Sequence, residues 1–305
     1  MKILIFGSKG LVGSSLNRIL TKNKNYKIIS SSREDTNLFN TSDTFKKINS
    51  VQPDIIINAA ARVGGIYAND TYRSQFLIEN LKINLNILEA CLSNPSIKII
   101  NLGSSCIYPL EAQNPISEEN FMNGKLEPTN SPYAMAKLTA IELGNSMKLQ
   151  YGTEVINLMP TNLYGPNDSF SDMDSHVIPG LIHRMHSAKE NHLEKFKIWG
   201  TGKPLREFLY VDDLSKAIEF IINKNISENI LNIGSGEEVS IKDLASLIKE
   251  TIGYSGELLF DDTKPDGNPR KLLDSSRFNN YGWTSSVKLK DGLTETYKWY
   301  LENII

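Results

Sequence analysis

The chain has 305 residues, of which 40% are hydrophobic and 22% charged, and its formal net charge at pH 7 is −2. That length allows one large or two modest domains, and the balanced charge gives no reason to expect a nucleic acid or an anionic membrane as a partner. Two cysteines are too few for a disulfide framework. The first apolar run is too short for a signal peptide, and no apolar stretch reaches the roughly 18 residues of a membrane helix. We therefore expect a cytoplasmic protein.

Strand and helix patterns alternate through the first half of the chain. We expect strands at 2–6, 26–31, 54–58, 98–102 and 154–158, and helices at 11–20, 77–92 and 131–150. Such alternation is typical of parallel β-α-β units. The sequence therefore predicts an α/β fold with a Rossmann-like, doubly wound parallel sheet covered by helices on both faces.

The alternation weakens from about Gly165, where segments rich in Pro, Gly, Asp and Ser appear. We expect a first domain over residues 1–165 and a smaller mixed α/β C-terminal substrate domain over 166–305. A segment near 205–235, with a strand at 229–234, is expected to return to the main sheet. The two domains would then be interleaved, with the site in the crevice between them.

A glycine-rich turn joins the first predicted strand to the first predicted helix. Gly7, Gly10 and Gly13 have the spacing G-x-x-G-x-x-G. Glycines allow a tight turn and let a pyrophosphate reach the free N–H groups of a helix N-terminus. A purely structural turn is the alternative, which the strand-before, helix-after context disfavours. The predicted cofactor-binding residues of this turn are Gly7, Lys9, Gly10, Leu11, Val12 and Gly13.

The residues after the second strand bear on the choice of dinucleotide. The chain reads Ser-Ser-Ser-Arg over 30–33, without an acidic residue to accept a hydrogen bond from a ribose 2′-hydroxyl. Arg33, together with Lys9, would flank a 2′-phosphate, so NADP(H) is the favoured cofactor. The alternative is that Arg33 is a solvated loop charge neutralised by Glu34 and Asp35.

Tyr133 and Lys137 are four residues apart in a predicted helix, so they share one helix face. We expect Lys137 to lower the pKa of Tyr133 and leave the phenol ready to transfer a proton. A Ser104 hydroxyl at the end of strand 98–102 would complete a proton-handling trio. Cys106 lies in the same segment and indicates carbanion chemistry, although a lone cysteine after a strand is usually a small core residue.

The remaining cysteine and several histidines invite other interpretations. We expect Cys91 to be a packed core residue. His183, His186 and His192 lack carboxylates or cysteines at metal-ligand spacing, so we expect a solvated helix edge and no metal site.

The motifs described above resemble the extended short-chain dehydrogenase/reductase family. Segments 58–66, 103–109, 159–166, 175–179 and 206–209 are similar, within that family, to the GDP-L-fucose synthases. The resemblance extends as far as Gly282 and Trp283. Lys9 departs from it, since arginine is more usual there, and the stretch 188–197 is short for the family.

The resemblance implies a role for each matching residue. Tyr133 would be the general acid at the C4 oxygen, Ser104 would hydrogen-bond that oxygen, and Lys137 would orient the nicotinamide ribose. Cys106 and His176 would be the base and acid of epimerisation. Further cofactor-binding residues would be Ala60, Leu102, Asn162, Leu163 and His176, and the GDP-sugar would contact Arg184, Trp199, Arg206, Asp266 and Lys271.

The implied activity is the NADPH-dependent 3,5-epimerisation and 4-reduction of GDP-4-keto-6-deoxy-D-mannose. A 4-reductase or an epimerase/reductase of a related GDP-4-keto heptose or dideoxyhexose would use the same residues. A 4,6-dehydratase is disfavoured because residues 105–107 lack an acidic pair, and a non-catalytic NADP-sensing protein would typically lose the Tyr or the Lys. The resemblance also implies a homodimer formed through helices 77–92 and 131–150.

Overall fold

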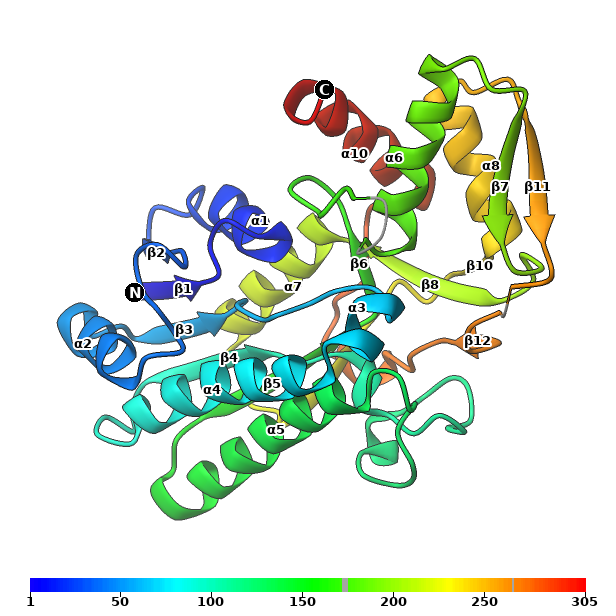
Figure 1. Cartoon of the computed structure of the whole chain (residues 1–305). Helices are drawn as coiled ribbons and strands as arrows, with labels where there is room; N and C mark the ends of the chain where they lie inside the picture. The colour runs from blue at the N-terminus through cyan, green and yellow to red at the C-terminus, as the bar shows by residue number, and fades with distance from the viewer. Residues whose placement is uncertain (172–174, 265) are drawn as a thin grey trace.

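The computed structural model describes residues 1–171, 175–264 and 266–305, and its larger part is built on one parallel sheet (Figure 1). Six strands lie in the order β2-β1-β3-β4-β5-β9, and every neighbouring pair is parallel. They are β1 (Lys2–Phe6), β2 (Lys27–Ser31), β3 (Ile55–Asn58), β4 (Lys98–Leu102), β5 (Val155–Pro160) and β9 (Ile230–Ile233). The predicted doubly wound sheet is thus confirmed. Its strand order reverses between β1 and β3, which is where such folds bind ligands.

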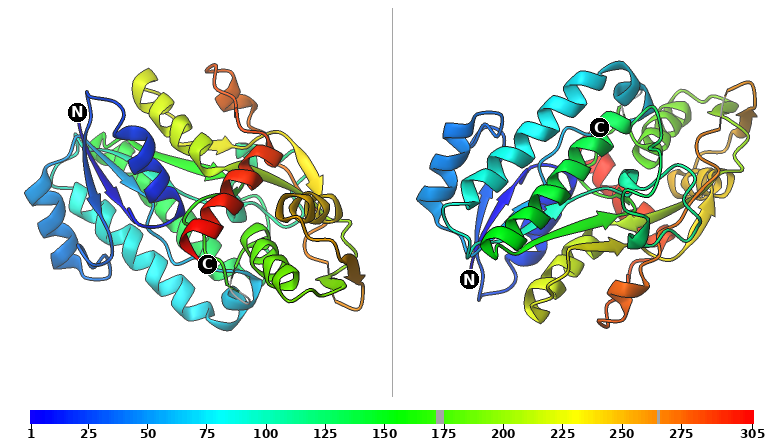
Figure 2. Two further views of the ribbon diagram at one scale, coloured as in Figure 1. Left: turned by 90° about the horizontal axis from the view of Figure 1, so that it is seen from above. Right: turned by 90° about the horizontal axis from the view of Figure 1, so that it is seen from below.

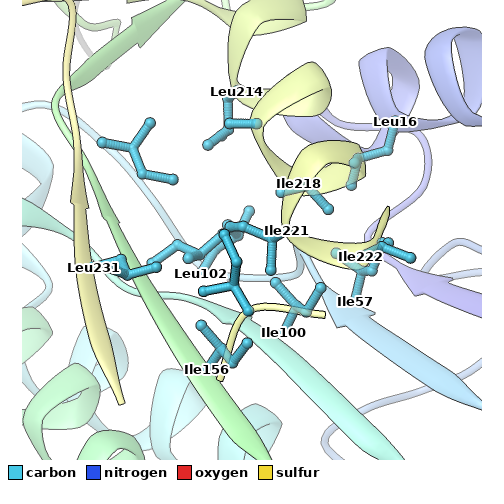
Figure 3. Close-up of a cluster of buried hydrophobic side chains, with 14 of the residues drawn as sticks. Leu16, Ile57, Ile100, Leu102, Ile156, Leu214, Ile218, Ile221, Ile222 and Leu231 are labelled. Carbon is cyan, nitrogen blue, oxygen red and sulfur yellow. The ribbon is translucent and has the colours of Figure 1, made fainter. Parts of the chain in front are cut away.

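Helices cover both faces of this sheet (Figure 2). One face carries α1 (Leu11–Leu20) and α7 (Val211–Lys224), and the other α2 (Thr41–Val51), α4 (Arg73–Cys91) and α5 (Ser131–Tyr151). Figure 3 shows the first layer, where Leu16, Leu214 and Ile218 pack on Ile57 and Ile100. The strands are apolar on both faces because each face is buried under helices. Cys91 is fully buried in the second layer, which confirms its predicted core role.

A row of asparagines crosses the centre of the sheet. Asn58, Asn101 and Asn157 are register partners on β3, β4 and β5. Asn58 Nδ2 donates to Asn101 Oδ1 at 3.0 Å, and Asn101 Nδ2 donates to Asn157 Oδ1 at 3.1 Å. Asn58 Nδ2 also donates to Asn84 Oδ1 of α4 at 3.0 Å. Buried amides cost free energy unless they are paired, so this row ties the middle strands into one register.

The smaller part of the molecule is a mixed layer beside the carboxyl ends of the strands. Strand β8 (Leu205–Tyr210) pairs with β6 (Asn162–Tyr164), β10 (Glu238–Ser240) and β12 (Arg270–Lys271), while β7 (Lys195–Trp199) pairs with β11 (Glu257–Asp261). Its helices are α6 (Val177–Glu190), α8 (Ile241–Ile252) and α10 (Leu289–Asn303). Four short helices adjoin the larger part: α3 (Ile66–Thr71) packs on α4, η1 (Ser105–Ile107) on α5, and η2 (Glu118–Asn120) and α9 (Ser276–Asn279) on β9. Between β8 and β10 the chain adds α7 and β9 to the main sheet, so the two parts are connected more than once.

The expectation of a solvated histidine edge on α6 was wrong for His186. That side chain is only 7% exposed, and its Nδ1 lies 3.0 Å from the Tyr297 hydroxyl of α10. His183 Nδ1 likewise lies 2.9 Å from the Tyr300 hydroxyl. The helix face is buried because α10 packs against it. Within the described residues no group of three or more His, Cys, Asp or Glu side chains is arranged to hold a metal ion. None of the described helices is both long and apolar enough to cross a membrane.

Candidate active site

The glycine turn between β1 and α1 has the geometry of an anion cradle. Gly7 has φ +77°, and a Cβ there would lie 2.7 Å from the Ala59 backbone. A Cβ on Gly13 would lie 2.1 Å from the Gly7 carbonyl oxygen, whereas one on Gly10 would meet nothing nearer than 3.6 Å. Gly10 is the N-cap of α1 and no side chain caps it, so the first N–H groups of the helix face open space. The turn therefore fits a pyrophosphate at the start of α1.

A cavity of about 580 Å³ runs from this turn past the ends of β2 and β3. Among the predicted cofactor residues it is lined by Gly7, Lys9, Gly10, Arg33 and Ala60. Sequence reasoning missed the rest of its wall, which is Ser32, Glu34, Thr36, Asn37, Leu38, Phe39, Ala59, Ala61, Arg62, Glu79 and Ile83. The cavity follows the switch point of the sheet, where a nucleotide is expected in this class of fold.

Arg33 lies at the rim of that cavity with its guanidinium 5.2 Å from the centroid of the Phe39 ring. The two acids that would neutralise it have other partners. Glu34 pairs with Lys9, and Asp35 Oδ2 accepts hydrogen bonds from the Ser32 hydroxyl at 2.7 Å and the Ser32 backbone at 2.8 Å. These Ser32 hydrogen bonds hold the pKa of Asp35 below its ordinary value. Across the described chain Arg33 has no ion-pair partner, so its charge faces the cavity mouth unopposed.

Tyr133 and Lys137 stand side by side on the first turns of α5. The Lys137 Nζ atom lies 5.7 Å from the centroid of the Tyr133 ring. Phe76 of α4 packs edge-on against the same ring, with centroids 6.4 Å apart. Lys137 is 2% exposed, and its ammonium donates to the Leu102 carbonyl at 2.7 Å, at the carboxyl end of β4. The i, i+4 spacing thus places both groups at the strand ends, beside the Ser104 segment.

The expectation that Lys137 lowers the pKa of Tyr133 was wrong. Burial raises the pKa of Tyr133, and the nearby Cys106 charge raises it further, while the hydrogen bond with Ser104 lowers it. Burial lowers the pKa of Lys137 itself to about 8. The physical reason is that the Lys137 ammonium donates its hydrogen bond to the Leu102 carbonyl. It therefore does not stabilise a negative charge on the Tyr133 oxygen.

Ser104 and Cys106 belong to the short turn that follows β4. Ser104 is the N-cap of η1, and its Oγ accepts a hydrogen bond from the Cys106 backbone N–H at 3.2 Å. The Cys106 sulfur is met by two donors, the Asn130 amide Nδ2 at 3.6 Å and the Lys271 Nζ at 3.8 Å. Asn130 was missed because a residue just before a helix carries no chemical signal in the sequence. Ser104, Cys106, Tyr133 and Lys137 therefore form one cluster.

His176 is the N-cap residue of α6. The residue as a whole is exposed, although protein atoms surround its ring closely enough for desolvation to lower its pKa. In the part of the chain that the structure describes, no hydrogen bond joins His176 to the cluster. Asn162, on β6, donates from Nδ2 to the Glu207 carbonyl at 2.8 Å, and Leu163 follows it on the same strand.

The five predicted substrate residues lie around the smaller sheet. Arg206 and Lys271 are register partners on β8 and β12. Burial lowers the pKa of Arg206, while the charge of Asp266 acts in the opposite direction. The Asp266 carboxylate accepts from the Thr201 backbone at 2.8 Å and from its hydroxyl at 2.6 Å.

The other two residues of this set occupy separate elements. Trp199 is 65% exposed at the end of β7, with Lys264 Nζ 5.9 Å from its ring centroid. Arg184 lies on α6 with its guanidinium 5.5 Å from the Phe196 ring centroid. The structure thus brings Lys271 to the cysteine, while the other four residues lie on α6, β7, β8 and the segment between β11 and β12.

The model of the NAD dependent epimerase/dehydratase family matches residues 3–234. The chain belongs to this family.

Its relatives place it more narrowly. The chain is 45% identical to the probable GDP-L-fucose synthase 1 of Oryza sativa subsp. japonica, over 100% of this chain and 93% of the relative. It is 40% identical to the GDP-L-fucose synthase of Escherichia coli (strain K12), over 99% of this chain and 97% of that protein. A GDP-L-fucose synthetase from Naegleria fowleri bound to NADP superposes with a TM-score of 0.90 at 29% identity, covering 99% and 94% of the two chains. The resemblance to the GDP-L-fucose synthases in the sequence motifs is confirmed.

Proposed function

We propose that this protein is a GDP-L-fucose synthase, which converts GDP-4-keto-6-deoxy-D-mannose to GDP-L-fucose by 3,5-epimerisation and NADPH-dependent 4-reduction. The observation that carries the proposal is the single cluster of Ser104, Cys106, Tyr133 and Lys137 at the carboxyl end of β4. Proton transfer at carbon and reduction of a carbonyl both need groups around one ketone, and this cluster supplies them together. Full-length similarity to synthases at 45% identity supports the same conclusion.

The residues at the switch point fit NADP(H). Gly7, Gly10 and Gly13 leave room for the pyrophosphate at the first N–H groups of α1, including those of Leu11 and Val12. Arg33 would hold the 2′-phosphate, because no acid among the described residues neutralises this charge at the cavity rim, and Lys9 would support it. Lys137 would hold the nicotinamide ribose, with Ala60, Leu102, Asn162, Leu163 and His176 lining the remainder. Bound NADPH supplies the hydride that reduces C4.

The chain's own residues would handle the protons. The C4 ketone acidifies the hydrogens at C3 and C5, because the carbanion formed there is delocalised onto the C4 oxygen. Cys106 would remove a proton and His176 would return one to the opposite face. Ser104 and Tyr133 would hydrogen-bond the C4 oxygen. The raised pKa of Tyr133 keeps its phenol protonated at neutral pH, as a donor to that oxygen must be.

The smaller layer would hold the nucleotide sugar. In this proposal residues 1–165, with the returning segment near 205–235, bind the cofactor, and residues 166–305 bind the GDP-sugar. Arg184, Trp199, Arg206, Asp266 and Lys271 would make the contacts. A homodimer would form through α4 and α5, whose outer faces expose Ile78, Leu85 and Met135.

A second candidate is the reduction of a related GDP-4-keto sugar, with or without epimerisation. It is favoured by a GDP-6-OMe-4-keto-L-xylo-heptose reductase from C. jejuni, which superposes with a TM-score of 0.91 at 31% identity over 99% of this chain and 97% of that one. A plain reductase would need Ser104, Tyr133 and Lys137 but not the pair formed by Cys106 and His176.

One NMR experiment separates these functions. The protein is incubated with GDP-4-keto-6-deoxy-D-mannose in D2O, with and without NADPH. Deuterium at C3 and C5, together with NADPH-dependent formation of the 4-hydroxy L-sugar, is the expected result. Reduction without deuterium would favour the 4-reductase. Absence of any turnover would contradict the proposed substrate and direct the test to other GDP-4-keto sugars.

A further inference from the structure

We propose that Lys271 is a positioning residue for Cys106, and that its ammonium and the Asn130 amide together hold the sulfur as a thiolate in the free enzyme. This inference rests on the proposed function, in which Cys106 is the base, and it gives Lys271 a role other than contact with the GDP-sugar.

The first observation is the pair of donors at the sulfur. Lys271 Nζ lies 3.8 Å and Asn130 Nδ2 lies 3.6 Å from Cys106 Sγ, and the lysine is 165 residues away in the chain. An ammonium can only donate hydrogen bonds, so it stabilises the sulfur most when the sulfur is a thiolate that accepts one. A lysine beside a cysteine is one of the arrangements that lower a thiol pKa and produce a nucleophile or base at neutral pH.

The second observation is that the backbone around Lys271 is anchored on both sides. Strand β12 runs parallel to β8, with Lys271 opposite Arg206. The Leu272 N–H donates to Asn114 Oδ1 at 2.7 Å, and the Leu272 carbonyl accepts from Ile116 N–H at 2.8 Å. The next N–H, of Leu273, donates to the Glu207 carboxylate at 3.2 Å. The backbone of Lys271 is therefore held in place by neighbouring elements, and the fold positions its side chain within reach of the sulfur.

The third observation is a carboxylate, Glu127, that bonds the backbone of one donor and feels the charge of the other. Glu127 Oε2 accepts from the Asn130 backbone N–H at 3.0 Å, which fixes the residue whose side chain meets the sulfur. Although burial opposes it, the pKa of Glu127 is lowered by hydrogen bonds from Thr129 and Asn130 and by the charge of Lys271. The charges then alternate from Glu127 through Lys271 to Cys106.

The groups that face the sulfur come from α5, from its N-cap residue and from β12. Tyr133 of α5 is a phenol that stays protonated, Lys271 of β12 is the only charged donor among the described contacts of the sulfur, and Asn130 is neutral. In the proposed step the thiolate takes a proton from C3 or C5 and becomes a thiol, and the C–H electron pair moves into the enolate. Lys271 itself exchanges no proton in this step. It stabilises the Cys106 thiolate before each turnover.

The test measures the thiol directly and needs no substrate. The full chain is alkylated with iodoacetamide between pH 5 and 10, and labelling is followed by mass spectrometry. Cys91 is fully buried, and Cys106→Ser identifies the labelled site. We expect Cys106 to be alkylated readily at pH 7. Lys271→Met should move the pH profile of labelling to higher pH and slow labelling at pH 7 about threefold, since the loss of thiolate exceeds the gain in nucleophilicity.

Matched variants make the result specific. Lys271→Arg keeps the charge and should restore most of the labelling rate at pH 7. Lys125→Met removes an exposed charge two residues before Glu127 and should leave the thiol unchanged. Asn130→Ala should move the pH profile of labelling less than Lys271→Met does, because a neutral donor stabilises an anion less than a charged one. Equal thiol pKa values in the wild type, Lys271→Met and Asn130→Ala would overturn the proposal.

A second readout separates this role from simple substrate binding. For a positioning role, the acid limb of C3/C5 deuterium exchange moves to higher pH in Lys271→Met, with a larger effect on kcat than on KM. A rise in KM with an unchanged pH profile would overturn it in favour of a contact with the GDP-sugar. If the thiol pKa shifts while no GDP-4-keto sugar exchanges deuterium, the thiolate assignment is supported and the proposed function fails instead.

Discussion

The ammonium of Lys137 donates to the carbonyl oxygen of Leu102 at 2.7 Å, which ties the first turns of α5 to the carboxyl end of β4. The contact spans 35 residues and brings Tyr133 to the turn that carries Ser104 and Cys106. Because β4 ends there, its last carbonyl lacks a continuing ladder, and the lysine satisfies it. Lys137 is therefore a structural link as well as the proposed ribose ligand.

The pH dependence of reduction should report Lys137. Burial lowers its pKa to about 8, so the side chain is charged below that pH and neutral above it. We expect kcat/KM for NADPH-dependent reduction to fall as the pH rises above about 8, since kcat/KM reports ionisations of the free enzyme. Lys137→Arg should move this fall in kcat/KM to higher pH. It should also lower the maximal kcat/KM, because the planar guanidinium fits the site poorly. If kcat/KM of Lys137→Arg falls at the same pH as in the wild type, the fall does not report Lys137.

The same ionisation should affect stability. The unfolded lysine binds a proton up to its ordinary pKa of 10.5, whereas the folded one loses it near 8. Between these values the unfolded state binds more protons, so this group's contribution to the free energy of unfolding increases with pH. Urea titrations of the wild type and Lys137→Met from pH 7.5 to 10.5 measure the difference in slope. Parallel curves would argue against the lowered pKa of Lys137.

Two alanine substitutions in the glycine turn should have different consequences. A Cβ on Gly13 would lie 2.1 Å from the Gly7 carbonyl, so Gly13→Ala should lower the melting temperature markedly. A Cβ on Gly10 meets no atom closer than 3.6 Å, so Gly10→Ala should fold normally yet bind NADPH at least about tenfold more weakly, because the methyl occupies the phosphate position. Calorimetry and fluorescence titration measure the two effects. Normal NADPH affinity in Gly10→Ala would contradict the cradle.

Cofactor choice should depend on Arg33. A charge-assisted contact contributes about 1.5–3 kcal/mol, so Arg33→Ala should reduce kcat/KM with NADPH by about tenfold or more and leave NADH little changed. Lys9→Ala is the matched control, and its effect should be smaller because Glu34 already pairs with that ammonium. A uniform loss with both nucleotides would show that Arg33 acts on the fold instead.

Glu207 is a residue whose importance the sequence does not reveal. It is 0% exposed, and its carboxylate accepts from Gly236 N–H at 2.8 Å and from Leu273 N–H at 3.2 Å. In Glu207→Gln an amide N–H must face one of these donors, so we expect a loss of about 1–3 kcal/mol in the free energy of unfolding. Glu237→Gln, at an exposed position, should cost much less.

The pH dependence provides a further check on Glu207. Burial raises the pKa of this carboxyl above its ordinary 4.5. The folded state then binds more protons than the unfolded state just above pH 4.5, so stability falls as the pH rises through that window. Denaturation curves of Glu207→Gln should lack this slope. An identical slope in both proteins would assign it to another group.

Epimerisation and reduction should separate in two variants. Cys106→Ser should impair deuterium exchange at C3 and C5 far more than NADPH affinity, because an alcohol is a much weaker base at neutral pH. Tyr133→Phe should mainly reduce hydride transfer, by removing the donor to the C4 oxygen. NMR exchange and NADPH oxidation are measured in parallel. Equal losses of NADPH affinity in both variants would contradict these roles.

Local patterns in the sequence were enough to predict the half of the molecule that is built on the parallel sheet. The strand β1, the helix α1 and the glycines between them are adjacent in the chain, so periodicity and spacing define their geometry. The i, i+4 relation of Tyr133 and Lys137 is equally local, and the structure confirms that the two side chains lie side by side. The strand expected at 229–234 does return to the main sheet, and only the structure shows that its neighbour there is β5.

Chemistry that depends on distant contacts could not be predicted in this way. The sequence by itself determined the doubly wound sheet, the glycine turn and the residue types of the cluster, because each follows from spacing along one or two elements. Only the tertiary structure decided the direction of the Tyr133 pKa, the burial of His186 and the meeting of Lys271 with Cys106. These outcomes depend on how β12 packs on β8, how α10 packs on α6, and how much water remains around each group, and no local pattern records those quantities.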